Sequence, residues 1–448
     1  MYKLKLIFRY LLKRRITHFA IVAVALCVFI VLVVMTVMNG LVQGFKEKNH
    51  AFVGDCVVGT ESLVGFPYYE EFIEALEAKD LALGISPVIR NYALLSVIGH
   101  DFKRGVEILG IDPIGHSRTT HFEETLLYHP GDPKAALKPV PDPNVPHCVA
   151  GVDMFLLRDA QGQYSRAGRA LQLNVTLTCF PLNARGAPGK IGTSVVNTQR
   201  FFCADHSHSG IARVDDSLIY IPLERAQELC MAGVDKRVTA VQIRFRPGIG
   251  VQEGTARVAE LWEEFAASKA DARNAFLLKT VTVQTWKQHR RAFIAPMEKE
   301  QVLLSFMFVL VGITTVFIVF VVFYMIIAHK KKDIGILKSA GASNASILSL
   351  FAGFAFSVGL LGAAAGSLLA WLFLAKVNDL EHWLFERIGW QLWDRTIYAI
   401  GEIPNRVEPE VVATIVCFAI LACLVGALIP SYLAARLRPV ETLHANRT

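Results

Sequence analysis

The chain has 448 residues, of which 53% are hydrophobic and 19% are charged, and its mean hydropathy is +0.40. This composition is too apolar for an ordinary soluble protein of this length, and it excludes a disordered chain, a collagen and a small disulfide scaffold. The net charge of +7 is concentrated beside the apolar stretches, so it does not indicate nucleic acid as a partner. The sequence predicts a membrane protein.

Four apolar stretches are each long enough to cross about 30 Å of hydrocarbon. The predicted organisation is a cytoplasmic amphipathic helix at 1–15, transmembrane helices at 16–45, 301–328, 347–375 and 411–435, a periplasmic domain at 46–300, a cytoplasmic coupling loop at 329–346, a short outer loop at 376–410 and a cytoplasmic tail at 436–448. The predicted fold class is a membrane protein with four transmembrane α-helices. A large α+β extracytoplasmic domain, of one or two subdomains, is inserted between helices 1 and 2.

Basic residues predict the orientation of the chain. Lysines and arginines precede the first span, lie between the second and third, and follow the fourth; Arg14, Lys331 and Arg436 are examples. By the positive-inside rule these segments, including both termini, are cytoplasmic. A cleaved signal peptide is the alternative for the first span, but the apolar run is long and Met35 to Gly44 offers no good cleavage site.

The block 46–300 has both strand and helix patterns. Apolar and polar residues alternate strictly in Leu171–Cys179, which predicts a half-buried strand. Further strands are expected at 91–98, 106–111, 218–221 and 239–245, and helices at 68–79, 223–231 and 251–270. Five cysteines fall in this block, and because an odd number leaves at least one unpaired, no disulfide framework is predicted.

No motif for catalysis or for a cofactor is present. Gly189-Lys190 continues with Ile191 and so is not a phosphate-binding loop, and neither G-x-S-x-G nor H-E-x-x-H occurs. Cys203, His206 and His208 fit no common zinc module, which favours a polar turn over a metal site. We therefore expect a non-catalytic chain that binds no metal or cofactor itself.

Three short features in the membrane region point to interactions. In residues 330–343, Ile334, Leu337 and Gly341 fall on one side of a predicted short helix rimmed by lysines. Such a face fits a groove on a partner, although a solvated basic loop is an equally good interpretation. Gly362 and Gly366 have the spacing that lets helices approach closely. Trp383, Trp390 and Trp393 in the predicted outer loop favour the lipid headgroup layer.

These segments resemble known permeases. Asp333-Ile-Gly-Ile-Leu-Lys-Ser-Ala-Gly-Ala-Ser343 is similar to the coupling helix of mechanotransmission-type ABC permeases of the FtsX-like superfamily, and Ile429–Leu443 resembles their ending. Met35–Gly40, Gly110–Pro113 and Tyr398–Pro404 are similar, in place and order, to segments of the lipoprotein-releasing (Lol) permease subunits. The resemblance covers essentially the whole chain and is weakest from Pro130 to Arg213.

The resemblance implies a permease subunit in the inner membrane that extracts lipoproteins and passes them to a periplasmic carrier protein. Its implied partners are cytoplasmic ABC ATPase subunits, which bind the ATP and Mg, and a second permease, identical or homologous. The ATPase-coupling role would fall on Asp333, Ile334, Gly335, Ile336, Leu337, Lys338, Ala340 and Gly341. The substrate cavity, beside membrane lipids, would be lined by Met35, Met38, Asn39, Phe306, Val309 and Ile313.

Three questions stay open at this point. The carrier-docking hairpin would fall in residues 181–200, where this sequence departs from the family pattern. A macrolide- or peptide-exporting ABC permease is an alternative function, although such chains usually carry a fused ATPase. A non-transporting regulator of peptidoglycan hydrolases is another, although its outer domain is usually much smaller.

Overall fold

The computed structural model describes residues 15–138, 145–156, 164, 173–190, 194–233, 235–388 and 403–436. The chain forms two compact units. Of the described residues, a helical unit takes in those up to Gln43 and those from Pro296 onward, and an α+β unit takes in those from Gly44 to Ala295.

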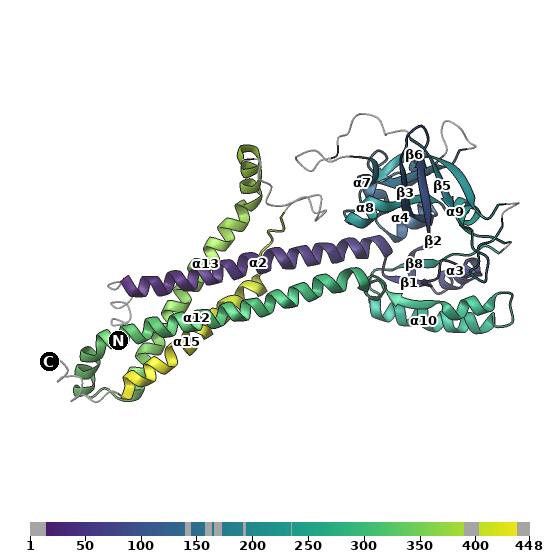
Figure 1. Ribbon diagram of the computed structural model, residues 1–448. Coiled ribbons are helices and arrows are strands. Elements are labelled where there is room, and N and C mark those ends of the chain that lie inside the picture. Colours follow the sequence, from purple (N-terminus) through teal and green to yellow (C-terminus); the bar gives the residue numbers. More distant parts are fainter. Residues whose placement is uncertain are drawn as a thin grey trace. The chain divides into compact units, whose positions relative to one another are not determined.

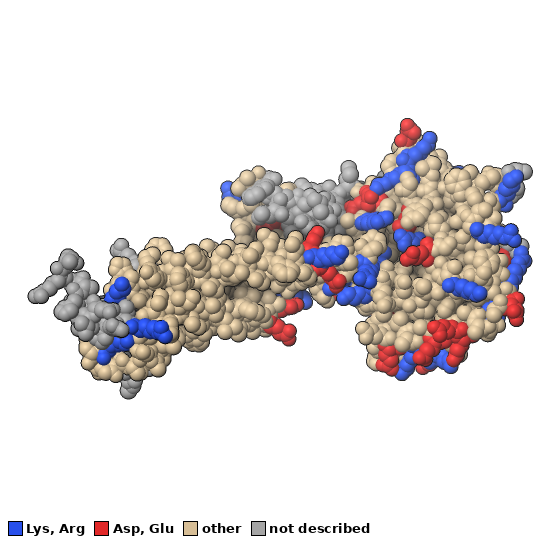
Figure 2. Space-filling model, turned by 60° about the horizontal axis from the view of Figure 1, so that its bottom comes forward, with Lys and Arg blue, Asp and Glu red and all other residues tan. Residues whose placement is uncertain are grey.

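Among the described residues, four helices are long and apolar enough to cross a membrane. They are α2 (Arg15–Val53), α12 (Arg291–Ser339), α13 (Asn344–Ile388) and α15 (Pro409–Arg436), as Figure 1 shows. The surface of the helical unit in Figure 2 is largely free of charged side chains, as lipid contact requires. With the α+β unit inserted between α2 and α12, the predicted fold class is confirmed.

The helices extend well past the apolar stretches. Helix α2 continues to Val53, and α12 is unbroken to Ser339, so most of the predicted loop 329–346 is helical. Helix α13 reaches Ile388, which places Trp383 on a helix and corrects its predicted loop position. Hydropathy marks where hydrocarbon contact ends, whereas backbone hydrogen bonding can continue into water. Trp390, Trp393 and the predicted amphipathic helix lie outside the described residues.

Glycines bring the membrane helices close together. A Cβ atom on Gly366 of α13 would overlap the carbonyl oxygen of Ala25 on α2, and one on Gly362 would lie 2.8 Å from Val24. A Cβ atom on Gly359 would lie 3.2 Å from the side chain of Cys423 on α15. The close approach predicted from the glycine spacing is therefore present, with α13 packed against both α2 and α15.

The described part of the α+β unit contains a nine-stranded mixed sheet in the order β3-β7-β4-β6-β5-β2-β8-β1-β9. The strands are β1 (Cys56–Gly59), β2 (Ala82–Val97), β3 (Lys103–Ile111), β4 (His147–Gly151), β5 (Leu173–Cys179), β6 (Asn197–Ser207), β7 (Leu218–Pro222), β8 (Ala240–Phe245) and β9 (Thr282–Thr285). Because β2 also pairs with β3, the strands from β3 to β2 in this order close into a ring. The five predicted strands are confirmed as β5, β2, β3, β7 and β8.

Helices cover both faces of this sheet (Figure 1). They are α3 (Tyr69–Glu77), α4 (Pro113–Thr119), α5 (Phe122–Thr125), α6 (Pro133–Leu137), α7 (Val152–Phe155), α8 (Ala212–Ser217), α9 (Leu223–Cys230), α10 (Val251–Ser268), the 3-10 helix η1 (Ala275–Thr280) and α11 (Trp286–His289). Helices α3, α9 and α10 pack on the main core, which contains Ile89. Helices α5, α6 and α8 pack on a second core, which contains Val88. Successive residues of a strand, such as Val88 and Ile89 of β2, therefore pack into opposite cores.

Candidate functional site

The predicted coupling segment forms the turn between α12 and α13. Helix α12 ends with the N–H of Ala342 bonded to the carbonyl of Leu337 and the N–H of Gly341 bonded to that of Lys338, both at 3.0 Å. Gly341 has a φ of 90°, a value that glycine adopts without strain and that ends many helices. Ser343 then caps α13 by accepting the N–H of Ser346 at 3.2 Å. The segment is therefore a tight helical corner with a defined shape.

Only part of this corner faces outward. Ile334 is 3% exposed and packs with Ile347 and Phe351 of α13 and Ala434 of α15, so its predicted place on an outward apolar face is wrong. Helical spacing identifies residues that share a face but does not show which face is covered by the chain's own helices. Of the predicted coupling residues, the exposed ones are Ile336, Ala340 and Gly341, which we call the coupling surface; Ile336 is 50% exposed.

Polar contacts fix the rest of the segment to its own chain. The Lys338 ammonium donates to the carbonyl of Ala435 at 2.6 Å, at the C-terminal end of α15, where a positive charge is favourable. Asp333 forms an ion pair with Lys330. Gly335 is buried and Leu337 is half-buried. Of these four residues, Lys338 joins the corner to α15, whereas the coupling surface remains accessible.

The residues predicted to line a substrate cavity lie on α2 and α12. Asn39 accepts a hydrogen bond from Gln301 at 2.7 Å, which joins the two helices, while Met35 and Met38 are half-buried. Phe306, Val309 and Ile313 of α12 are 66%, 59% and 58% exposed and form a stripe on one side of that helix. The single chain leaves this stripe open to its surroundings.

A buried arginine joins α2 to the start of α12 inside the α+β unit. Arg290 is 6% exposed and donates from Nε to the side-chain oxygen of Asn49 at 2.9 Å. Its guanidinium lies over the rings of Phe293 and Phe52, 4.2 and 5.1 Å from their centroids. Burial and the neighbouring Arg90 lower the pKa of Arg290 to about 10, so it stays charged at neutral pH.

The strands that connect these helices to the sheet are also paired. Strand β1, which follows α2, pairs with β9, which precedes α11 and α12. His50 stacks on Trp286 at 4.6 Å and contacts the carboxylate of Asp55 at 2.7 Å. Burial raises the pKa of Asp55, but the hydrogen bonds from His50 and from the N–H of Phe245 outweigh it, and the pKa is lowered. We call Asn49, His50, Asp55, Trp286 and Arg290 the α2–α12 clasp.

Sequence reasoning did not identify the clasp. Its members come from two segments far apart in the chain, and no spacing rule connects them. The available signal was the polar run from Lys46 to His50, which follows a long apolar stretch of the same helix. A cleft of about 730 Å³ lies beside the clasp, lined by Arg290 together with Arg90, Glu107 and Gln242 of the sheet.

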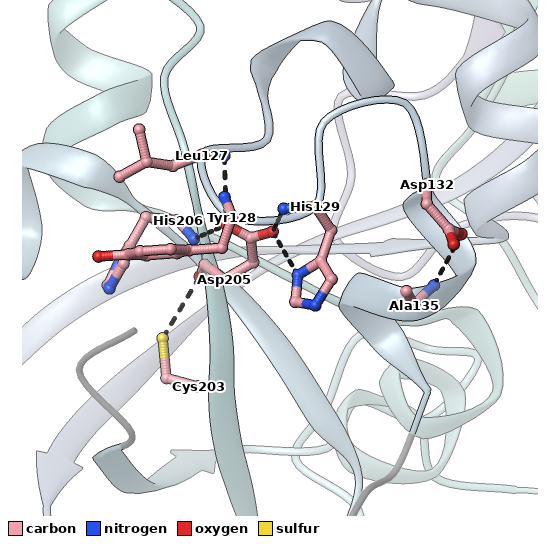
Figure 3. Close-up of polar contacts among 8 residues, drawn as sticks. All are labelled: Leu127, Tyr128, His129, Asp132, Ala135, Cys203, Asp205 and His206. Carbon is pink, nitrogen blue, oxygen red and sulfur yellow. Dashed lines mark hydrogen bonds and ion pairs between the residues drawn. The ribbon is translucent and has the colours of Figure 1, made fainter. Parts of the chain in front are cut away.

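Asp205 has a structural role. It lies on strand β6, which continues to Ser207, so the prediction of a polar turn at 203–208 is wrong. It is fully buried and accepts hydrogen bonds from the backbone of Leu127, Tyr128, His129 and His206 and from the ring of His129 (Figure 3). These bonds run from 2.6 to 3.2 Å. The carboxylate therefore attaches the segment 127–129 to the sheet. Among the described residues, no group of three His, Cys, Asp or Glu is arranged to hold a metal.

The helical corner and the helices that it joins define the class of protein. Residues 305–439 match the family model described as FtsX-like permease C-terminal. This part of the chain, which holds most of α12 together with α13 and α15, is an FtsX-like permease domain.

Relatives extend the comparison to the whole chain. It is 25% identical, over 437 residues, to the lipoprotein-releasing system transmembrane protein LolC of Neisseria meningitidis serogroup B, covering 96% of this chain and 94% of that protein. It is 28% identical, over 120 residues, to the uncharacterized ABC transporter permease MJ1507 of Methanocaldococcus jannaschii, covering 27% of each. The periplasmic region of MacB from Actinobacillus actinomycetemcomitans matches 55% of this chain and 95% of its own, with 10% identity and a TM-score of 0.31.

The predicted resemblance to lipoprotein-releasing permeases within the FtsX-like superfamily is confirmed by these matches. The chain is similar to permeases of the ABC type. Together with the four apolar helices, the full-length relative indicates a multi-pass protein of the inner membrane.

Proposed function

We propose that this chain is a permease subunit of an ATP-driven ABC transporter that extracts lipoproteins from the inner membrane for delivery towards the outer membrane. The observation that carries the proposal is the similarity, over 96% of the chain, to a protein named for lipoprotein release. This similarity includes the α+β unit as well as the FtsX-like part. It is therefore not limited to the membrane helices that permeases of other activities share.

The proposed assembly contains cytoplasmic ABC ATPase subunits, which bind ATP and Mg, and a second permease. Both termini lie in the cytoplasm and the α+β unit lies in the periplasm, where a carrier protein receives the lipoprotein. The coupling surface contacts the ATPase because it combines an exposed apolar side chain, Ile336, with the small residues Ala340 and Gly341. Small residues let the partner's backbone approach closely.

The helix α12 supports a mechanical route from the ATPase to the α+β unit. It is continuous from Arg291 to Ser339, with the coupling surface at one end and the clasp residue Arg290 directly before the other. A displacement at Ile336 would be transmitted along the hydrogen-bonded helix to the clasp. ATP binding can drive this movement only if it favours one position of α12 over another.

The lipoprotein's acyl chains would lie against Met35, Met38 and Asn39 of α2 and the stripe of Phe306, Val309 and Ile313 on α12. The stripe is apolar and exposed in the single chain, as a surface for lipid or acyl chains must be. We propose that the second permease closes this cavity. The cavity would then form only in the assembled transporter.

Depletion of the protein in its host, followed by separation of the inner and outer membranes, tests the proposal. Triacylated lipoproteins should accumulate in the inner membrane as the protein is depleted, and a plasmid-borne wild-type copy should restore their sorting. Unchanged sorting would overturn the proposal. Loss of peptide export or of cell separation with normal sorting would indicate one of the alternative functions.

A further inference from the structure

Two of the buried cysteines in the α+β unit are in direct contact. Cys179 at the end of β5 and Cys230 at the end of α9 are 2% and 0% exposed, and their sulfur atoms lie 3.8 Å apart. A disulfide requires a sulfur separation of about 2.05 Å. The two sulfur atoms would therefore have to approach each other by about 1.8 Å to form the bond.

A second pair lies across neighbouring strands. Cys148 of β4 is directly opposite Cys203 of the parallel strand β6. Paired strands lie about 4.8 Å apart, which falls within the range of Cα separations that a disulfide spans. Both side chains are buried in the same core, so they leave the sheet on the same face.

The fifth cysteine of the unit is separate from these pairs. Cys56 is fully buried on β1, and its neighbours include the Thr255 hydroxyl of α10. Burial raises the pKa of its thiol to about 12. The odd number of cysteines, which argued against a disulfide framework in the sequence, is thus explained as two adjacent pairs and one core residue.

We propose that Cys179–Cys230 and Cys148–Cys203 are disulfide bonds in the native protein. This inference rests on the proposed periplasmic position of the α+β unit, because disulfides persist in that compartment and are rare in the cytosol. They would tie β5 to α9 and β4 to β6, and three of these elements belong to the closed ring of strands.

The oxidant is a protein disulfide of the periplasm, and the exchange balances in two steps. One cysteine thiolate attacks the oxidant's disulfide and releases one of its thiols, and the second cysteine thiolate then attacks the mixed disulfide and releases the other. Two thiols of this chain lose two electrons and two protons, which the oxidant gains. Contact with the partner cysteine and burial raise the pKa of Cys148 and Cys230, so we expect the exchange to occur while the domain folds.

Thiol counting on the full chain tests the inference. The protein is extracted from its host membrane with acid quenching, denatured, and labelled with a maleimide mass tag with or without prior reduction. We expect four tags without reduction, on Cys27, Cys56, Cys417 and Cys423, and all eight after reduction. Peptide mass spectrometry should find 148 linked to 203 and 179 linked to 230. In the double variant Cys179→Ala/Cys230→Ala, the 148–203 link should remain.

Eight tags without reduction, or cysteine links in other combinations, would overturn the inference. A second variant separates this failure from a failure of the proposed orientation. Glu61 is exposed in the α+β unit, so Glu61→Cys should react with a membrane-impermeant maleimide in intact spheroplasts. If position 61 is labelled in intact spheroplasts but the native cysteines are found as free thiols, the disulfides alone are rejected. Labelling only after lysis would reject the periplasmic orientation, and the disulfides with it.

Discussion

At the residue scale, Asp205 shows how a buried charge can organise a loop. Its carboxylate accepts four backbone N–H groups and one ring N–H, so no other side chain can replace it without leaving buried donors unpaired. The neighbouring residues Cys203 and His206 suggested a turn or a metal site in the sequence. The observed role depends on contacts with residues that are distant in the sequence, such as Tyr128, which is 77 positions away. No local pattern reveals such contacts.

The variant Asp205→Ala should lose about 3 kcal/mol of stability or more, because removing one partner leaves several buried donors unsatisfied. Thermal unfolding of the detergent-solubilised chain measures the change. Asp132→Ala is the matched control: the Asp132 carboxylate accepts one exposed N–H, from Ala135 at 3.0 Å, so its loss should cost about 1 kcal/mol. Equal effects of the two variants would contradict the role assigned to Asp205.

His116 should make the α+β unit sensitive to acid. It is 1% exposed and contacts the Ser86 hydroxyl at 3.0 Å, and burial lowers its pKa to about 3. The unfolded chain, with a histidine pKa of about 6.5, therefore binds a proton that the folded chain does not. Stability is lost as pH falls below about 6.5, by about 2 kcal/mol at pH 5.

The variant His116→Gln keeps a hydrogen-bonding group but cannot be protonated in this range. The loss of stability between pH 7 and pH 5 should therefore be smaller in the variant by about 2 kcal/mol. Unfolding curves of both proteins at the two pH values measure this difference. If both proteins lose the same stability, the buried neutral state of His116 is wrong.

At the element scale, the α2–α12 clasp is the feature that connects the two long helices within the α+β unit. Arg290→Ala removes the hydrogen bond to Asn49 and the contacts with Phe52 and Phe293, and should destabilise the unit by about 2 kcal/mol. Faster hydrogen exchange in residues 45–53 is the direct measurement. The adjacent Arg291 is exposed, so Arg291→Ala should leave the exchange unchanged. An equal increase in both variants would contradict the clasp.

The crossing of α13 and α2 depends on the absence of a side chain at Gly366. In Gly366→Ala the new methyl group would meet the backbone oxygen of Ala25, and helix separation should cost about 1 to 3 kcal/mol. A lower melting temperature in detergent is expected. A Cβ atom on Gly312 of α12 would have no neighbour within 4 Å. Gly312→Ala is therefore the control and should not lower the melting temperature. A Gly366→Ala protein as stable as the wild type would reject the close crossing.

Local pattern predicted the type of most elements but not their neighbours. Alternation in β5 and helical spacing in α10 were sufficient because one face of each is buried. The ring closure between β2 and β3 and the partners of β7 depend on contacts distant in sequence, which no window contains. For the same reason helical spacing predicted the helix at 333–341, but the burial of Ile334 against α13 and α15 was missed.

At the scale of the whole molecule, helix α12 extends from directly after the clasp residue Arg290 to the coupling surface, and these are the two ends of the proposed mechanism. The coupling surface is held by its own turn and by Lys338, so a partner that presses on Ile336 would act on the end of α12. The clasp at the start of α12 joins the same helix to α2. In the proposed assembly the energy would enter through the partner ATPase, so we expect this chain to need no catalytic residue of its own.

Lipoprotein release from spheroplasts tests the central claim most directly. Cells depleted of the native protein express the wild type, Ile336→Asp or Ile336→Leu, and the measured quantity is the fraction of a newly made triacylated lipoprotein that leaves the membrane when carrier protein is added. The wild type and Ile336→Leu, which keeps the apolar contact, should release it. Ile336→Asp should release at least tenfold less at equal expression, because a charge at the coupling surface costs more than about 1.4 kcal/mol of contact energy. The account would be contradicted if Ile336→Asp, or cells that lack the protein, released as much lipoprotein as the wild type.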